Sequence, residues 1–444
     1  MFANFLYATA LLLASPVILY RAIRHNRYRR GVAEKLFGLS SSKCRRWHSS
    51  RGCIWFHAVS VGEVNLLPGV IRELERQQPN HQPIVISTST DTGYDLAIKY
   101  FGSDRVFFCP LDFTWAVKRT LRNLKPAKLV LVELELWPNL IRQANRHFCE
   151  VVVINGRLSD RSAGRYQRAS LPTRPIFSAL HWVGCQDEAC RSRFESCGTP
   201  ADRLTVTGSL KFDDAPSSRE GAEVESCTEW AGIDPWHRVW LVGSTQSGEE
   251  AMAIDIYRAL IQEHADLRLI LVPRHKERFD EVAKLIEDAG FEVRRRSRDG
   301  GLKSESWAAH QVILVDTIGE LRNWWGTAQI ATVGGSFGNR GGQNMLEPAG
   351  YGCAVSFGPN TRNFREIAEA LIDGGGAVRV QDSCSLERFV RRCLDDVPQA
   401  DALGQAARQV IARHRGATGR TVKEMIRRKG SGAVRQWGSG NRAA

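Results

Sequence analysis

Short runs of strand-forming residues alternate with helix-forming stretches along almost the whole chain, and this rhythm constrains the fold more than any other feature. In the first half the runs are 53–60, 83–90, 128–135, 151–155, 181–186 and 204–213. In the second half they are 238–246, 267–275, 291–296, 311–317, 329–335 and 353–359. Strands that alternate with helices form parallel sheets with helices on both faces. The sequence therefore predicts an α/β protein with two doubly wound domains of similar size.

The stretch 213–222 (DDAPSSREGA) divides the two series of strands. It is rich in turn residues and poor in apolar ones, which is typical of a linker. It separates a predicted domain at 25–214 from one at 223–430, and 444 residues with 43% apolar content suffice for two such cores. The Gly/Ser-rich segment 431–444 is predicted to be disordered.

The net charge of +13 is concentrated at the two ends of the chain. Residues 1–51 hold ten Lys and Arg against one acid, residues 408–444 hold ten against one, and the remainder carries 13 − 18 = −5. No basic stripe with interleaved aromatic residues occurs between the ends, so nucleic acid is not expected as a partner. Basic ends around an acidic body favour an anionic membrane surface instead.

Residues 2–20 are almost wholly apolar and are followed at once by arginines. A cleaved signal peptide would have its charges before the apolar run, so we predict a membrane anchor over 1–24. The run is just long enough to span a bilayer, although Asn4 and Pro16 also allow a shallow helix that lies in one leaflet. The positive-inside rule predicts that the body of the protein lies on the cytoplasmic side of the membrane.

Eleven cysteines without a C-x-x-C pair indicate a reducing compartment and core thiols rather than disulfides. Cys185, Cys190 and Cys197 are close in sequence, but no second pair at ligand spacing accompanies them. We therefore expect no metal site there.

A glycine-rich segment at 333–364 follows a predicted strand and precedes a predicted helix. Two glycine pairs, 334–335 and 341–342, lack side chains where a ligand would approach the backbone. Residues Asn344 to Glu347 are expected to form the first turn of a helix, whose N–H groups and dipole would bind a phosphate. Glu347 would then accept hydrogen bonds from both hydroxyls of a ribose. The glycine pairs alone are equally compatible with a connection that binds nothing.

Polar residues follow nearly every predicted strand, and ligands of open α/β sheets bind beyond the carboxyl ends of the strands. We therefore expect two ligand-binding edges that face each other across a cleft. The residues in the first domain are Glu63, 88–93, Glu133, Glu135, 155–159 and Lys211. Those in the second domain are 243–248, 273–275, Gly319 and Glu320.

Taken together, these segments resemble the 3-deoxy-D-manno-octulosonic acid (Kdo) transferase family over residues 1 to about 428. The motifs are HAVSVGEV (57–64), STSTDTG (87–93), ELELWPN (133–139), NGRLSDRS (155–162), GSLKFD (208–213), VPRHKERF (272–279), DTIGEL (316–321) and GGQNMLEPAGYG (341–352). The resemblance implies a GT-B fold, in which two Rossmann-like domains face each other and the last helix packs back on the first domain. It also implies one N-terminal anchor, a cytoplasmic active site at the inner membrane, and catalysis without a metal or cofactor.

The resemblance also implies roles for single residues. Glu63 matches the catalytic base, and Glu133 and Lys211 match the positions that stabilise the transition state. The positions that match CMP contacts are Arg274, His275, Ile318, Gly319, Glu320, Asn344, Met345, Leu346 and Glu347. The chain departs from the family pattern at Gln246 and Gln343, where histidine is usual, and at Leu134, where threonine is usual.

The chemistry of the residues is consistent with these roles but does not require them. Glu63 begins a predicted helix, where the helix dipole should keep it ionised and able to act as a base, although a purely structural acid is the alternative. Lys211 could neutralise the donor's carboxylate or could be a solvated surface lysine. Glu133 and Glu135 would share one face if their strand continued through them. Paired carboxylates suggest glycoside hydrolysis, which would not explain the glycine-rich segment.

The resemblance thus implies a transferase that moves Kdo from CMP-Kdo to a lipid A precursor at a membrane. Arg274 suits the CMP phosphate because a guanidinium binds two oxygens at once, whereas His275 could equally be structural. The arginines at 157, 161 and 165 could contact acceptor phosphates. The alternatives are a GT-B transferase that uses another nucleotide sugar, such as a UDP-hexose, and a membrane-bound binding protein without activity.

Overall fold

The computed structural model describes residues 29–47, 49–300 and 307–428, together with a few separate positions before residue 29. The chain divides into two compact units, each with one seven-stranded parallel sheet. Unit 1 comprises Met1–Asp214 and Arg415–Ala444, and unit 2 comprises Ala215–His414. The predicted α/β class with two doubly wound sheets is confirmed.

The sheet of unit 1 has the strand order β3-β2-β1-β4-β5-β6-β7. Its strands are β1 Cys53–His57, β2 Ile84–Thr88, β3 Val106–Phe108, β4 Pro126–Val132, β5 Glu150–Gly156, β6 Trp182–Cys185 and β7 Leu204–Val206. Trp55 and Phe56 are successive residues of β1, and their side chains belong to two different apolar clusters. A strand alternates its side chains between two faces, so both faces of this sheet are covered.

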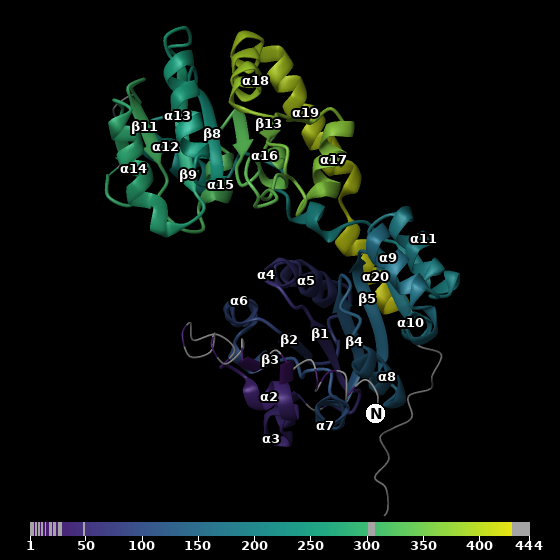
Figure 1. The fold of residues 1–444 in the computed structure, drawn as a ribbon. Coiled ribbons are helices and arrows are strands. Elements are labelled where there is room, and N and C mark those ends of the chain that lie inside the picture. The colour runs from purple at the N-terminus through teal and green to yellow at the C-terminus, as the bar shows by residue number, and fades with distance from the viewer. Residues whose placement is uncertain are drawn as a thin grey trace, which may run out of the picture. The chain divides into compact units, whose positions relative to one another are not determined.

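Helices of unit 1 cover these two faces (Figure 1). They are α2 Val32–Phe37, α3 Ser41–Cys44, α4 Val61–Val64, α5 Leu67–Gln77, α6 Asp91–Phe101, α7 Thr114–Leu124, α8 Pro138–Arg146, α9 Asp160–Arg168, α10 Ser170–Phe177, α11 Glu188–Ser196 and α20 Ala417–Arg427. A short 3-10 helix, Leu210–Asp214, ends the first segment of this unit.

The sheet of unit 2 has the order β10-β11-β9-β8-β12-β13-β14. Its strands are β8 Arg238–Thr245, β9 Leu267–Pro273, β10 Glu292–Arg295, β11 Gln311–Leu314, β12 Ile330–Val333, β13 Ala354–Phe357 and β14 Ala377–Arg379. Its helices are α12 Ala222–Ala231, α13 Glu249–Leu260, α14 Phe279–Asp288, α15 Leu321–Trp325, α16 Leu346–Gly350, α17 Arg365–Asp373, α18 Ser383–Asp395 and α19 Val397–His414.

Every run predicted as a strand contains one, but two strands were not predicted. These are β3 and β14, which lie at an edge of their sheets and have three residues each. Three residues are too few to show a hydrophobic period, and the equally short edge strand β7 was predicted only as part of the longer run 204–213.

Helix α20 belongs to unit 1 although it follows all of unit 2 in the sequence. In Figure 1 this yellow helix lies among the blue and teal elements of unit 1. The Asp213 carboxylate accepts hydrogen bonds from the backbone N–H groups of Gly416 (2.7 Å) and Thr418 (2.6 Å), which open the helix. Near its other end, the Lys128 ammonium donates to the carbonyl of Met425 (2.6 Å). Its apolar side packs against α5.

All eleven cysteines are free thiols, and ten of them are buried. Cys185, Cys190 and Cys197 belong to one apolar cluster of unit 1. They are core residues, as the sequence predicted.

Most of the predicted anchor at 1–24 and the whole predicted tail at 431–444 lie outside the described residues. Among the helices that are described, none has the length and apolar character needed to cross a membrane. Asn4 and Tyr7, two described positions of the anchor segment, contact residues in the rest of unit 1. The side-chain oxygen of Asn4 accepts from the backbone N–H of Thr114 (3.1 Å), and the ring of Tyr7 lies edge-on to Phe113.

Candidate active site

Glu63 lies in the turn between β1 and α5, and its carboxylate folds back on that turn. Oε2 accepts from the backbone N–H of Val59 (2.8 Å), and Oε1 accepts from the hydroxyl of Ser60 (2.8 Å). The same hydroxyl caps the four-residue helix α4 by accepting from the N–H of Glu63. Glu63 is only 7% exposed. Its carboxyl group is therefore held in one orientation.

The loop after β2 supports this turn from the side. The hydroxyls of Thr88 (3.2 Å) and Thr90 (3.1 Å) both donate to the carbonyl of Val59. A side chain at Gly93 would bring its Cβ within 2.6 Å of the Thr88 hydroxyl. The motif at 87–93 is thus explained by its contacts with the turn that carries Glu63.

The electrostatic state of Glu63 differs from the prediction. Burial, which is the largest cause, and the charges of Glu135 and Glu133 together raise the pKa of Glu63 from its ordinary value to about 7, against the hydrogen bonds from Val59 and Ser60, which lower it. The expectation that a helix dipole keeps this carboxyl ionised was wrong, because α4 is a single turn and loss of water outweighs the effect of the dipole. A carboxyl group with a pKa near 7 is suited to proton transfer at neutral pH.

Glu133 and Glu135 do not continue a strand, so the condition for a shared face is not met. β4 ends at Val132, and Glu133 has a positive φ of 61°. The two carboxylates have different partners. Oε1 of Glu133 lies 3.1 Å from the Lys211 ammonium, whereas Oε2 of Glu135 accepts from the indole N–H of Trp137 (3.1 Å). Burial raises the pKa of Glu135.

Asn155 joins the Glu133 loop to the segment that carries Lys211. It is fully buried at the end of β5 and has a positive φ of 54°, which asparagine tolerates better than most residues. Its amide N–H donates to Oε1 of Glu133 (3.4 Å), and its oxygen accepts from the backbone N–H of Leu210 (3.0 Å). The motif at 155–162 was recognised from the sequence, but this role of its first residue was not.

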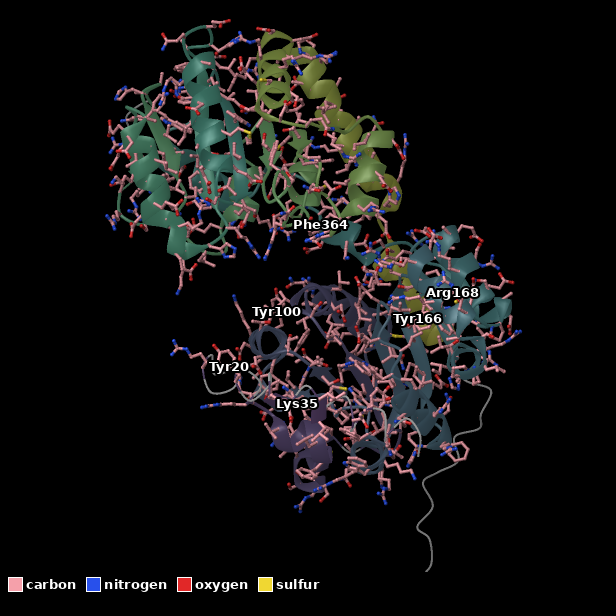
Figure 2. The ribbon with its side chains drawn as sticks, in the orientation of Figure 1. Tyr20, Lys35, Tyr100, Tyr166, Arg168 and Phe364 are labelled. Atoms are coloured by element: carbon pink, nitrogen blue, oxygen red, sulfur yellow. The ribbon has the colours of Figure 1, made fainter. Side chains whose placement is uncertain are left out.

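A group of arginines follows β5 in the same unit. Arg161 and Arg165 are exposed on α9, and Arg157 is half-buried just before that helix. Figure 2 shows Arg168 at the end of α9, close to Tyr166, whose ring packs against Phe177. This surface offers several cations to an anionic ligand.

In unit 2, Arg274 and His275 follow the carboxyl end of β9 and are exposed. The backbone N–H of Arg274 donates to the carbonyl of Thr245 (3.2 Å), at the end of the neighbouring strand β8. This hydrogen bond joins the segments 243–248 and 273–275, both of which were predicted to lie at the ligand-binding edge of the second sheet.

The turn at Ile318, Gly319 and Glu320 lies between β11 and α15. Ile318 is 70% exposed and Gly319 has a positive φ of 95°. Oε2 of Glu320 accepts from the guanidinium of Arg296 (2.9 Å) and from the indole of Trp324 (3.3 Å). Although burial opposes ionisation, these hydrogen bonds hold the pKa of Glu320 below its usual range. Glu320 therefore has a structural role in any case.

The glycines of this segment are explained by contacts within the protein, which is the alternative that the glycine pairs left open. A Cβ at Gly334 would lie 2.6 Å from Oε2 of Glu249, and a Cβ at Gly341 would lie 2.6 Å from the side chain of Arg362. Gly335, Gly341 and Gly342 also have positive φ. The missing side chains make room for protein atoms and for left-handed backbone, which is a sufficient reason for glycine at these positions.

The helix after these glycines begins at Leu346, two residues later than predicted. The Asn344 side chain accepts from the backbone N–H of Leu346 (3.1 Å) and donates to Oε1 of Glu347 (3.2 Å). Met345 and Leu346 are buried, so their side chains belong to the core. Asn344 and Glu347 are the residues of this turn whose polar side chains are only half-buried.

The predicted residues thus form one group in each unit. In unit 1, Glu133 forms a salt bridge with Lys211, and its charge contributes to the raised pKa of Glu63. In unit 2 the predicted CMP contacts follow β9, β11 and β12 at the carboxyl edge of the sheet.

Comparison with known proteins decides the family. A family model described as 3-Deoxy-D-manno-octulosonic-acid transferase (kdotransferase) matches residues 28–214. The 3-deoxy-D-manno-octulosonic acid transferase of Haemophilus influenzae is 34% identical over 427 residues, which cover 94% of this chain and 97% of that one. The chain belongs to the Kdo transferase family. The resemblance inferred from the motifs is confirmed, and with it the assignment as a glycosyltransferase.

A second Kdo transferase agrees with this assignment, and a more distant structure shares the fold. The enzyme of Bordetella pertussis is 32% identical over 83% of this chain and 86% of its own. The structure of UDP-GlcNAc 2-epimerase from Neisseria meningitidis bound to UDP-GlcNAc has a TM-score of 0.55 at 13% identity and covers 84% of this chain and 98% of that one. That likeness concerns the fold alone, which is the GT-B fold.

Proposed function

We propose that this member of the Kdo transferase family transfers Kdo from CMP-Kdo to a lipid A precursor in lipopolysaccharide synthesis, with Glu63 as the general base. The observation that carries the proposal is the buried Glu63 carboxyl, which two hydrogen bonds orient and whose pKa is raised to about 7. A base with a pKa near 7 is about half ionised at neutral pH. Its pKa is also high enough to favour transfer of a proton from the acceptor hydroxyl to the base.

In the proposed reaction, Glu63 takes the proton of an acceptor hydroxyl. The hydroxyl oxygen then bonds to the anomeric carbon of Kdo, while the bond between that carbon and the CMP phosphate oxygen breaks and its electron pair leaves with CMP. The Lys211 ammonium, which Glu133 holds, would face the carboxylate of Kdo as positive charge develops on the sugar.

We assign the CMP moiety to unit 2. The exposed Arg274 guanidinium would bind the phosphate with two donors, and His275 would add a third. Glu347, which Asn344 orients, would accept from the ribose hydroxyls. The turn at 318–320 would contact the nucleobase of CMP. Glutamines stand at positions 246 and 343, and glutamine cannot carry a proton at neutral pH, so the proposal assigns no acid or base role there. No step requires a metal ion.

We further propose that residues 1–24 hold the enzyme at the inner membrane with its body on the cytoplasmic side. The support is the apolar run that arginines follow and the excess of positive charge at both ends of the chain. Contacts of Asn4 with Thr114 and of Tyr7 with Phe113 link this segment to unit 1.

The decisive experiment is the product mass after purified full-length protein is incubated with a CMP-Kdo generating system and a lipid A precursor. We expect the acceptor to gain the mass of one or more Kdo residues. A parallel titration calorimetry experiment should show binding of CMP and not of UDP. Binding of UDP alone would favour a transferase with another donor, and CMP binding without any product would favour a binding protein.

A further inference from the structure

Glu249 is a buried glutamate that the motifs did not single out. It is the first residue of α13, and it is only 4% exposed. Its Oε2 accepts from the backbone N–H groups of Gln246 (2.8 Å) and Gly335 (2.8 Å). Its Oε1 accepts from those of Ser336 (3.2 Å) and Phe337 (3.2 Å). One carboxylate thus receives four backbone hydrogen bonds.

These four donors belong to two loops at one edge of the sheet. β8 and β12 are parallel neighbours in which Gly243 pairs with Val333, so the loops that follow them leave the sheet side by side. Gln246 lies in the first loop and residues 335–337 lie in the second. The absence of a side chain at Gly334 makes room for Oε2, because a Cβ there would approach it to 2.6 Å. The two loops are therefore joined through the Glu249 side chain.

Both loops lead directly to residues that we assign to CMP. In the first loop, the carbonyl of Thr245 accepts from the backbone N–H of Arg274 (3.2 Å). In the second, the carbonyl of Gly335 accepts from the N–H of Gly342 (2.7 Å), two residues before Asn344. A displacement of either loop would move one side of the CMP site relative to the other.

We propose that Glu249 is a positioning residue of the donor site: its carboxylate fixes the loop at 334–337 against the loop at 244–248 and so sets the spacing of the CMP contacts. This inference rests on the proposed function, because CMP is the ligand that the two loops are taken to bind. Glutamine at position 249 would keep the shape of the side chain, but its NH2 group would face backbone N–H groups that now donate to a carboxylate oxygen. Since an NH2 group cannot accept those hydrogen bonds, they would be lost.

The test uses the full-length protein and two main measurements, with the Michaelis constant for the acceptor as a third. Amide hydrogen exchange without ligand reports whether residues 335–337 are held, and calorimetry reports the Kd of CMP. For Glu249→Gln we expect exchange at 335–337 to be about 10-fold faster or more and the CMP Kd to rise by about 10-fold or more, with the Michaelis constant for acceptor within about twofold of the native value. Glu287→Gln, an exposed change on α14, is the matched control and should alter neither.

The two measurements separate the failure of this inference from that of the proposed function. Native protein that does not bind CMP would overturn the proposed function, whereas native protein that binds CMP and a Glu249→Gln variant that binds it within about twofold would overturn the inference. If Glu249→Gln does not fold, Glu249→Asp takes its place. Aspartate keeps the carboxylate but is shorter by one methylene group, so the carboxylate lies farther from the backbone N–H groups. Unchanged exchange and unchanged CMP affinity in folded Glu249→Asp would equally overturn the inference.

Discussion

Glu63 in unit 1 and Glu249 in unit 2 occupy similar places, yet the structure surrounds them differently. Each follows the carboxyl end of a central strand, and each is almost fully buried. An ionised carboxylate accepts about four hydrogen bonds. Glu249 receives four from the backbone, whereas the described contacts give Glu63 two and place the charges of Glu133 and Glu135 nearby. From this difference we infer that Glu63 can still accept a proton from a substrate, whereas the hydrogen bonds of Glu249 serve to hold the loops at 244–248 and 334–337.

The largest expected effect tests the Glu63 side of this comparison. Glu63→Gln keeps the shape of the side chain but removes the base, so turnover should fall by about 10²–10⁴-fold. CMP affinity should stay within about twofold, because the proposed CMP contacts belong to unit 2. Turnover above about a tenth of the native value would show that Glu63 is not the base.

A smaller effect is expected at Glu347, which differs from Glu249 in being only half-buried. Glu347→Ala should raise the CMP Kd by about 10–150-fold, since a hydrogen bond to a charged group contributes roughly 1.5–3 kcal/mol. Glu369→Ala, an exposed change on α17, is the control. Calorimetry that finds the same CMP affinity in both variants would place the ribose elsewhere.

The stability of Glu63→Gln gives a third comparison. Because burial raises the pKa of Glu63 from 4.5 to about 7, the folded protein binds this proton more tightly than the unfolded chain, and its stability falls as pH rises between these values. Glu63→Gln should therefore be more stable than the native protein at pH 8, by at most about 3 kcal/mol, and the difference should shrink toward pH 5. Denaturant unfolding at the two pH values measures it, and a difference that grows toward pH 5 would contradict the raised pKa.

The pH dependence of the reaction tests the same carboxyl group. Only ionised Glu63 can accept a proton, so kcat/KM should rise with pH and level off above about 7. Below that value it should fall by about tenfold per pH unit. CMP affinity should not follow this curve. A kcat/KM that is flat between pH 5 and pH 7 would exclude a base with this pKa.

The smallest effect is expected at the N-terminus. Deletion of residues 1–24 should leave a folded enzyme that acts on detergent-dispersed acceptor, because every motif begins at or after His57. The remaining basic residues should keep some affinity for anionic vesicles, since each surface cation contributes up to about 1 kcal/mol. Vesicle flotation should show binding that falls with salt. Binding that does not respond to salt, or no binding at low salt, would refute a role for the basic ends.

The sequence was sufficient where the determining interactions are local. Strand-forming runs placed the carboxyl ends of the strands, so the positions of Glu63, Lys211 and Arg274 beyond those ends could be predicted. It was not sufficient where the contacts or the backbone conformation of a residue depend on a partner that is distant in the sequence. Gly335 donates its N–H to Glu249, 86 residues away in the sequence, and no local pattern distinguishes that donor from one that awaits a phosphate. The left-handed backbone of Glu133 was missed for a similar reason, because its N–H bonds to Ile154 in the next strand.

The position of α20 has a consequence for how the protein is made. Unit 2 is one continuous segment, so it can fold on the ribosome as soon as residue 414 has emerged. Unit 1 begins first but lacks its last helix, and the Asp213 carboxylate lacks the N–H groups of Gly416 and Thr418, until the end of the chain has been synthesised. The half of the enzyme that holds the proposed base is therefore completed last, so a chain released early would contain a finished unit 2 and an unfinished unit 1.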